Sequence, residues 1–571
     1  MSRRSRVVGR ALCGAVMLST ASCGAVPGGA AAGLGGARGS GALRREDRVV
    51  LTRTSDVTAV AASQRMVYVA TTGGLAIYDR TFQTWRPPLA AGDALPNGRP
   101  TALAADPSSD GVWVGGVGSV TYYQATTDFE TSATVPGIVE VIAFDRGDPQ
   151  AGAYVRASGQ WSLVSSSGFV RPLSPAQLPN GRLSAPPSLR QLYQEYPALQ
   201  SFSSLLTRDA ELRSWPVSAA AKSPDRTSEL WVGTMGGGLF RVDPNFNQAE
   251  QLPFGLLDRG AGALALAADG VWVAGLGDVG SSRGGLTFVS DDLQRWRWLE
   301  SGYAGGGSSL VGARSLDLEV RGNRAWLATD RGVARIDTRS GGGSGRATDV
   351  VVWSALNGLP SDVALSVAAR PDGAWVGTSS GLVFVSDSGS ARSAAPSSVS
   401  AVLGSGGAVR ALLATGDTLW VGTDFGLDFV PPAGADGTRR LVRAGAQETD
   451  PRLARRITAL ATSDSAVAVA TDGAIIFYDR HTGRPMTSTD VAAIGAIGGV
   501  RALAMDGNTV WAAGPSGVVV VTRATGAARF LSVPRDVPAE AFDVVLERDY
   551  AWIATRDGVV RLRRLSDGSV P

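Results

Sequence analysis

The chain has 571 residues with 54 Lys and Arg, 51 Asp and Glu, one His and two Cys, and a formal net charge of +3. So few His and Cys residues nearly exclude zinc and copper sites, and they leave catalysis by a nucleophile and a histidine base poorly supported. Lys222 is the only lysine and there is no basic run, so nothing favours nucleic acid as a partner. We therefore expect no catalytic, cofactor-binding or metal-binding residues, and no cofactor.

Residues 1–22 have the pattern of a bacterial export signal. Four Arg precede an apolar run from Ala11 to Leu18, which is too short to serve as a permanent membrane span. The four residues TASC, ending at Cys23, resemble a lipobox, in which the cysteine is diacylated and becomes the mature N-terminus. We therefore predict a lipoprotein signal peptide and lipidation at Cys23, with ordinary cleavage nearby as the alternative. The protein is then extracytoplasmic, either periplasmic or at the cell surface, and touches the membrane only through its N-terminal lipid.

Residues 23–46 are rich in Gly and Ala, which predicts a flexible tether between the lipid and a folded body. Arg48–Arg53 then has the composition of a strand without a hairpin partner. At the other end of the chain, Asp543–Arg563 supplies only three strands. We expect the N-terminal strand to complete this last unit, because pairing of the two termini removes exposed sheet edges.

Residues 47–571 consist of one repeated pattern, which is clearest at Val409–Leu427. Apolar residues alternate at its start, Gly416-Asp417 supplies a turn, and Leu419–Thr423 runs back as the next strand. A glycine then breaks the chain before a third strand. The pattern predicts a three-stranded antiparallel meander with an aromatic residue near the start of its middle strand.

Aligned on this aromatic position, the pattern has eleven copies, of which ten carry an aromatic residue and eight carry Trp. The eleven positions are Tyr68, Trp113, Tyr154, Trp231, Trp272, Trp326, Trp375, Trp420, Ala468, Trp511 and Trp552. Two residues further on, every copy has Gly or Ala except for Arg156. A small residue on a middle strand predicts the close approach of a neighbouring backbone or aromatic ring. The fixed place of the Trp residues favours the core over a carbohydrate-binding surface.

Successive copies are 41 to 54 residues apart, except across one gap of 77 residues. Most copies also offer a more variable fourth strand, as at Val350–Trp353. Short strands with this period predict an all-β fold of four-stranded β-propeller blades, which must stack because one blade cannot bury both of its faces. Eleven blades exceed the roughly four to eight of a usual ring, so we expect two rings. Either the second ring is inserted within the first, or the N-terminal strand serves the second ring across an interface.

The repeat resembles that of the two-component regulator propeller family, found in the extracytoplasmic sensor halves of some bacterial hybrid sensor kinases. The best copies are Val363–Leu382, VALSVAARPDGAWVGTSSGL, and Val409–Leu427, and the resemblance covers roughly Val57–Arg563. It implies a sensor-type propeller. No transmembrane helix or kinase segment follows the repeats, so we expect a stand-alone protein rather than direct signalling by this chain.

The gap of 77 residues contains the one departure from the β pattern, a predicted helical insertion at about residues 186–213. Ser188 is a suitable N-cap with Gln191 three residues later, and apolar residues follow at helical spacing until Pro197 interrupts them. Two interpretations are open. The insertion caps a propeller face or partly frames a binding pocket, or it packs between rings or replaces a degenerate blade.

Two further features bear on catalysis. Asp291 and Asp292, followed by Trp296 and Trp298, resemble an Asp-box turn and have the composition of a sugar-stacking site with a nearby acid. Asp residues also cap backbone amides in hairpin turns. This second interpretation, a turn-capping role for Asp291 and Asp292, is favoured. The single histidine, His481, lies in a predicted turn, where we expect an exposed structural role.

These features predict a non-catalytic protein that binds a ligand on its loop-lined faces and acts as a sensor-like or envelope interaction scaffold. The ligand or envelope protein that it binds is unknown, and carbohydrate is one class to be tested. The alternative is a polysaccharide-active glycoside hydrolase or lyase that uses carboxylates on a propeller face.

Overall fold

The computed structural model describes residues 43–571 except for the stretches 91–94, 96–99, 202, 210–211, 227, 278–284, 301–312, 340–344, 347–349, 388–398, 403–406, 431–441, 444–450, 481–485, 487–488 and 491. The predicted signal peptide, Cys23, most of the predicted tether and His481 lie outside the described residues. None of the helices in the described part of the chain has the length and apolarity needed to cross a membrane.

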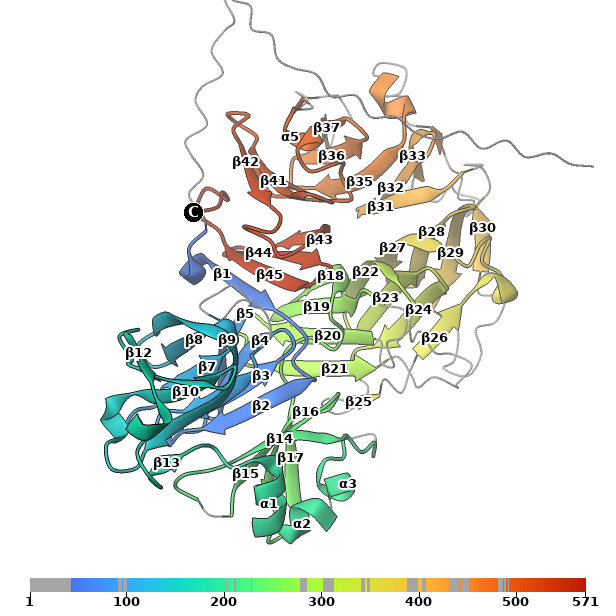
Figure 1. The fold of residues 1–571 in the computed structure, drawn as a ribbon. Coiled ribbons are helices and arrows are strands. Elements are labelled where there is room, and N and C mark those ends of the chain that lie inside the picture. The colour runs from blue at the N-terminus through green and yellow to red at the C-terminus, as the bar shows by residue number, and fades with distance from the viewer. Residues whose placement is uncertain are drawn as a thin grey trace, which may run out of the picture. The chain divides into compact units, whose positions relative to one another are not determined.

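Most of the described chain is β-structure, and its antiparallel sheets are built from strands that follow one another in the sequence (Figure 1). The N-terminal sheets are β2 (Val57–Ala62), β3 (Met66–Thr71), β4 (Gly74–Asp79) and β5 (Thr84–Ala90); β6 (Ala102–Ala105), β7 (Val112–Gly115), β8 (Val117–Gln124) and β9 (Phe129–Asp145), continued by β10 (Ala153–Ala157), β11 (Gln160–Val164) and β12 (Val170–Leu173); and β14 (Val217–Lys222), β15 (Leu230–Thr234), β16 (Gly238–Asp243) and β17 (Gln248–Leu252). The long strand β9 serves twice, because it pairs with β8 through its first half and with β10 through its second.

The C-terminal sheets repeat the same order. They are β18 (Ala261–Ala267), β19 (Gly270–Gly275), β20 (Gly285–Ser290) and β21 (Trp296–Glu300); β22 (Ser315–Arg321), β23 (Arg324–Thr329), β24 (Gly332–Asp337) and β26 (Val350–Trp353); β27 (Ala364–Arg370), β28 (Gly373–Thr378), β29 (Gly381–Ser386) and β30 (Val399–Val402); β31 (Val409–Thr415), β32 (Thr418–Thr423), β33 (Gly426–Val430) and β34 (Val442–Arg443); β35 (Ile457–Thr462), β36 (Ala466–Thr471), β37 (Ala474–Asp479) and β38 (Thr489–Asp490); β39 (Ala502–Met505), β40 (Thr509–Gly514), β41 (Gly517–Thr522) and β42 (Ala528–Ser532); and β43 (Ala541–Leu546), β44 (Tyr550–Thr555) and β45 (Gly558–Arg563).

Short elements connect these sheets. Two small strands add to them, since β13 (Leu183–Ser184) pairs with β9 and β25 (Gly345–Arg346) pairs with β21. The helices are α1 (Leu189–Glu195), α2 (Pro197–Ser201), α3 (Ser203–Leu206) and α5 (Ala492–Gly495), with single 3₁₀ turns η1 (Arg45–Asp47), η2 (Pro149–Ala151), η3 (Pro175–Gln177), η4 (Ala355–Asn357) and η6 (Pro451–Ala454).

The sheets stack through the strand that comes first in each, which we call the first strand. Among the C-terminal sheets, the first strands contact one another in the order β18, β22, β27, β31, β35, β39 and β43, and β43 in turn contacts β18. Among the N-terminal sheets, β14 contacts β2, β2 contacts β6, and β6 contacts β9. This stacking is consistent with propeller-like blades, and it confirms the prediction of an all-β fold.

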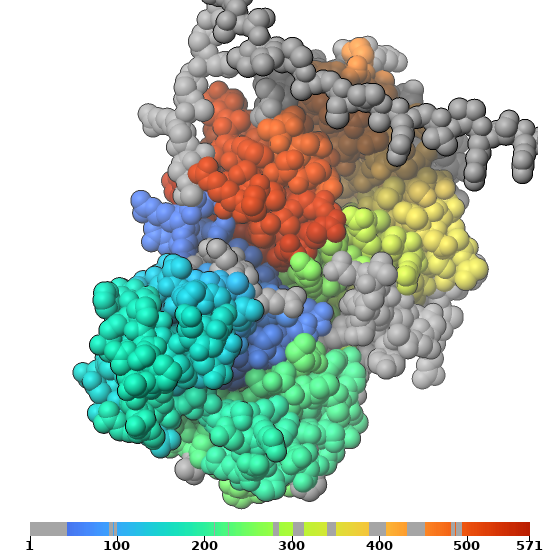
Figure 2. Space-filling model, in the orientation of Figure 1, coloured from blue at the N-terminus to red at the C-terminus, as the bar shows by residue number. Residues whose placement is uncertain are grey.

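The last sheet is completed by the N-terminal strand β1 (Arg48–Leu51), as predicted. It pairs antiparallel with β45, with Val50 opposite Val560 and Leu51 opposite Val559. Blue N-terminal residues accordingly lie against red C-terminal ones in the space-filling view (Figure 2). Since β2 to β17 lie between β1 and β18 in the sequence, the N-terminal sheets are an insertion after the first strand of the chain.

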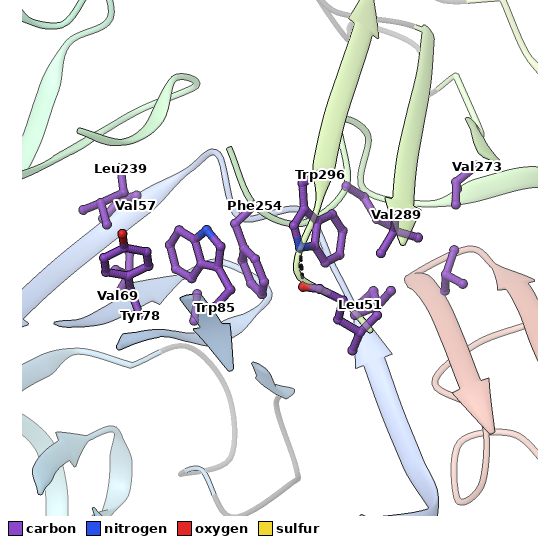
Figure 3. Packing of buried hydrophobic residues seen from close by; sticks show 14 of the residues in the cluster. Leu51, Val57, Val69, Tyr78, Trp85, Leu239, Phe254, Val273, Val289 and Trp296 are labelled. Atoms are coloured by element: carbon purple, nitrogen blue, oxygen red, sulfur yellow. Dashed lines mark hydrogen bonds between the residues drawn. The ribbon is translucent and has the colours of Figure 1, made fainter. Parts of the chain in front are cut away.

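The two segments that enter and leave this insertion run side by side. A parallel bridge joins Arg53 to Leu256, whose amide donates to the Thr52 carbonyl at 2.9 Å. Beside them, Phe254 stacks on Trp85 of β5 with ring centroids 4.2 Å apart, and it lies 4.8 Å from Trp296 of β21 (Figure 3). The row of three rings therefore joins the N-terminal and C-terminal sheets in one buried core.

The eleven repeat positions lie on the second strand of every unit, and ten of them, nine aromatic residues and Ala468, are buried. Several also tie the second strand to the end of the first strand. The indole Nε1 of Trp113 donates to Asp106 at 2.9 Å, and that of Trp231 donates to Ser223 at 2.8 Å. Core placement is confirmed for these residues. Trp420 is the exception, because it is only half-buried.

The small residue two positions after each aromatic has a specific neighbour. A Cβ added at Gly377 would lie 2.6 Å from Cγ1 of Val409, and one added at Gly422 would lie 2.7 Å from Cγ2 of Ile457. Val409 and Ile457 begin the first strand of the following sheet. Of the two predicted neighbours, a backbone or an aromatic ring, the ring is absent at these two glycines, and a β-branched aliphatic side chain lies there. At Gly377 the Val409 carbonyl oxygen is also close, at 2.7 Å.

Replacing the buried Trp326 with Ala should lower the free energy of unfolding by about 3 to 5 kcal/mol, because it leaves a large cavity in the core. The matched Trp420→Ala variant should lose clearly less free energy of unfolding, since the Trp420 side chain is only partly buried. Thermal unfolding of the two variants beside the unaltered protein makes the comparison. Equal falls in melting temperature would contradict the conclusion that Trp326 lies deeper in the core than Trp420.

Candidate functional site

A pocket lies where the first strands of the N-terminal sheets end. Ala62 ends β2, Ala105 ends β6, Asp145 ends β9 and Lys222 ends β14, and all four line one cavity of about 320 Å³. These four strands contact one another in series, and all of them end at the same cavity. They therefore run in the same direction. The pocket is therefore an opening at one end of their stack, which is a usual place for a ligand site.

The pocket is hollow because its walls carry short side chains. The sequences VTAVAA of β2, ALAA of β6 and VSAAAK of β14 place several Ala along the strand ends. Pro107, Pro149, Pro186 and Pro187 complete the wall. Proline has no backbone N–H, so this wall is poor in hydrogen-bond donors. The cavity is thus largely apolar, with its charged groups at the strand ends.

Asp145 is the one carboxylate among the described lining residues, and its oxygens are already occupied. Oδ1 accepts from the Gly147 amide at 2.8 Å, and Oδ2 accepts from Arg182 at 3.0 Å. The side chain is only 3 % exposed. Asp145 therefore shapes the pocket rather than offering a free base.

Lys222 is also paired, with Glu195 at the end of α1. Nζ lies 2.5 Å from Glu195 Oε1 and 5.5 Å from the centre of the Tyr196 ring. The hydrogen bond raises the pKa of Lys222 and lowers the pKa of Glu195, so both groups stay charged near neutral pH. The pair links the helical insertion to the strand end that lines the pocket.

The helical insertion begins with the predicted cap. The Ser188 amide donates to Oε1 of Gln191 at 2.8 Å, and the Gln191 amide donates back to Ser188 Oγ at 3.4 Å. Leu199 and Leu206 are buried against Phe240 in one core. The helices α1 to α3 thus cover the sheet of β14 to β17, which they adjoin in Figure 1, while the preceding residues 184–187 line the pocket. None of the described residues of α1 to α3 lines the pocket, so whether the insertion frames a binding site stays a prediction.

Arg156 precedes the helical insertion in the sequence and departs from the repeat. It stands where every other repeat has Gly or Ala, and it forms an ion pair with Glu140 at 2.9 Å instead of making room for a following sheet. The next sheet in the sequence begins only at Val217, after β13 and the helices. The departure from the repeat thus coincides with the insertion and with one side of the pocket.

The sugar-stacking interpretation of the stretch after β20 was wrong. Trp296 is buried against Phe254, and Nε1 of the buried Trp298 donates to the Gly255 carbonyl at 2.9 Å, so neither ring offers a free face. Asp292 accepts from Ser290 Oγ at 2.5 Å and from the Gln294 amide at 3.0 Å, which lowers its pKa. These are the bonds of a turn cap, as the second interpretation predicted.

Sequence reasoning missed the partner of Asp291. Glu547, just after β43, lies beside it, and burial together with this second carboxyl group raises the pKa of Glu547 to about 7. Arg561 donates to the Asp291 carbonyl and stacks 4.3 Å from the centre of the Tyr550 ring. No local pattern could have found this pair, because its members are far apart in the chain.

Three further carboxyl groups link the first strands of the C-terminal sheets. Asp543 accepts from the Leu264 amide at 2.7 Å, Asp317 from the Val367 amide at 2.8 Å, and Glu319 from the Ala369 amide at 2.6 Å. A first strand has no partner along its inner edge, so these side chains satisfy its unpaired amides. Burial raises the pKa of Asp317 to about 6 and those of Glu319 and Asp543 to about 7.

These raised pKa values predict that the free energy of unfolding falls as the pH rises from about 4 to about 7. In this range the folded protein binds more protons than the unfolded chain, whose carboxyl groups have already ionised, so each step in pH favours unfolding. Thermal unfolding at pH 5, 6, 7 and 8 measures the slope. Asp543→Asn should flatten it, and Asn at the exposed turn residue Asp464 should not. If Asp543→Asn leaves the pH dependence of the free energy of unfolding unchanged, the raised pKa of Asp543 is refuted.

No protein family model matches the sequence, and no curated protein matches it. Among solved structures, the chain is similar to an extracellular domain assigned to the hybrid two-component system BT4673 of B. thetaiotaomicron, with 13% identity over 89% of this chain and 70% of that one and a TM-score of 0.40. The corresponding domain of BT3049 has 13% identity, coverage of 89% and 68%, and a TM-score of 0.40. The computationally designed protein Ika8 has 15% identity, coverage of 62% and 96%, and a TM-score of 0.35. These values assign no family.

Proposed function

We propose that the protein is an exported, lipid-anchored double β-propeller that binds a ligand without transforming it, as a sensor-like or envelope interaction scaffold. The observation that carries the proposal is the pocket at the shared ends of four first strands. Propellers and other β-rings bind ligands at such openings because several strands contribute side chains to one point. The export signal and the lipobox-like residues ending at Cys23 support the extracytoplasmic location.

The proposed double propeller has one ring of seven C-terminal blades and one of four N-terminal blades. The long sheet from β6 to β12 supplies two of these four, and β9 is the first strand of the second. The seven first strands from β18 to β43 contact one another in succession and return to β18, which supports the larger ring. In the smaller ring, β14, β2, β6 and β9 contact one another in series, and the strand ends converge on the pocket. Together the two rings account for the eleven repeats.

Binding is favoured over hydrolysis by the state of the carboxyl groups. Asp145, the one carboxylate among the described residues that line the pocket, is held by Arg182 and Gly147. A general base needs a carboxylate that can reach the substrate, and a glycosidase needs two that are separated. We therefore expect no product from polysaccharides incubated with the protein.

A pocket-filling variant tests the proposal. Ala185 lines the pocket and is exposed, so Ala185→Trp should block the opening without disturbing the core. The mature chain is heated with envelope glycans, peptidoglycan fragments and small organic acids. A ligand at about 100 times its Kd should add roughly 2.7 kcal/mol to the free energy of unfolding, seen as a rise in melting temperature.

The control is Ala528→Trp, which adds the same ring at an exposed position on β42. The rise should survive in this control and disappear in Ala185→Trp. Absence of any ligand in the panel, or a rise that persists in Ala185→Trp, would contradict the proposal. Product formed from a polysaccharide would favour the hydrolase instead.

A further inference from the structure

The pocket has a charge balance and a lining that select for a class of ligand. We infer that it takes a compact organic anion, with an apolar body among its Ala and Pro walls and a carboxylate or similar single negative group on Arg146. This inference rests on the proposed function, because it concerns the same pocket.

Arg146 carries the uncompensated charge. It lies directly after β9 and lines the cavity, and its side chain is exposed. Among the described residues, the one hydrogen bond of its side chain runs from Nη2 to Ser184 Oγ at 3.4 Å, which is long and therefore weak. Among the described residues it has no acidic partner. A guanidinium group presents a planar pair of N–H donors that matches a carboxylate, so Arg146 is free to bind one.

The other charges at the pocket cancel in pairs. Asp145 is held by Arg182 at 3.0 Å, and Lys222 is held by Glu195 at 2.5 Å. A ligand that carries one negative charge therefore meets one positive charge, and it does not need to break an existing ion pair. A cationic ligand would face Arg146 without a carboxylate to receive it.

The walls exclude a sugar as the best ligand. Ala61, Ala105, Ala221 and Pro186 present methyl and methylene groups, and Phe144 is the one aromatic ring among the described lining residues. Phe144 is only 7 % exposed, so it offers no face for stacking. A sugar would have to bury several hydroxyl groups against these walls without hydrogen-bond partners, which is unfavourable. The apolar part of an organic acid has no hydroxyl groups, so it can be buried against these walls without losing hydrogen bonds to water.

The size of the cavity sets the size of the anion. A volume of about 320 Å³ holds on the order of ten water-sized groups. This is the lower end of the range for small-molecule sites. A single-ring or branched-chain carboxylate fits this limit, and a long acyl chain does not.

Calorimetric titration of the mature chain with phenylacetate and isovalerate tests the inference. The matched neutral compounds are phenylacetamide and isovaleramide, which keep the shape and lose the charge. We expect saturable binding of at least one carboxylate, with an affinity at least tenfold higher than that of its amide. Arg146→Gln should remove this preference, because it removes the charge and leaves a shorter, neutral polar side chain.

The matched control is Arg171→Gln, since Arg171 is an exposed arginine on β12 of the same sheet that does not line the pocket. It should bind as the unaltered protein does, and both variants should keep its melting temperature. Equal affinity for acid and amide, or undiminished binding by Arg146→Gln, would overturn the inference.

The outcome separates this inference from the proposed function. If a glycan or a neutral compound binds, Ala185→Trp abolishes that binding and no carboxylate binds, the pocket is a ligand site of another class and only this inference fails. If neither the acids nor any other compound binds, both fail.

Discussion

The pairing of β1 with β45 is the constraint on which the rest of the molecule depends. It holds the first and last strands of the fold in one sheet, so every residue between β1 and β18 must leave that group of sheets and return to it. The outgoing and returning segments meet at the Arg53 to Leu256 bridge, where Trp85, Phe254 and Trp296 form a continuous row. Aromatic contacts of this kind contribute roughly 0.5 to 1.5 kcal/mol each beyond the burial of their area. The same row that closes the core makes Trp296 unavailable to any ligand.

Between neighbouring sheets, the same contact recurs. A glycine on a second strand receives a β-branched side chain from the start of the next first strand, as Gly377 receives Val409. Where Arg156 replaces the glycine, this contact cannot form and the chain inserts β13 and three short helices before the next sheet. The pocket opens beside that interruption. The candidate site is thus found where the repeat fails, as is common where function takes precedence over regular packing.

Most acidic groups discussed here serve the fold. Asp106 accepts from a core Trp, Asp292 caps a turn, and Asp543 satisfies an amide of the adjacent sheet. Carboxyl groups committed in this way are poor candidates for catalysis, even where burial raises their pKa into the range of an acid or base. Arg146 differs because its charge has no such commitment among the described residues. A positive group at the mouth of an apolar cavity is better suited to holding an anion than to chemistry.

The strands, their order, the burial of most of the repeated aromatic positions, the cap at Ser188 and the pairing of the termini were predictable from the amino-acid sequence. Each of these follows from local periodicity, turn chemistry or the need to cover a sheet edge, and all are readable within one repeat or at the chain ends. Only the tertiary structure decided that Val409 fills the space beside Gly377, that Trp296 and Trp298 are buried, and that Glu547 meets Asp291. It also decided which strand ends enclose the pocket. These contacts join residues that are far apart in the chain, so their partners are set by how the sheets stack, and no single repeat carries that information.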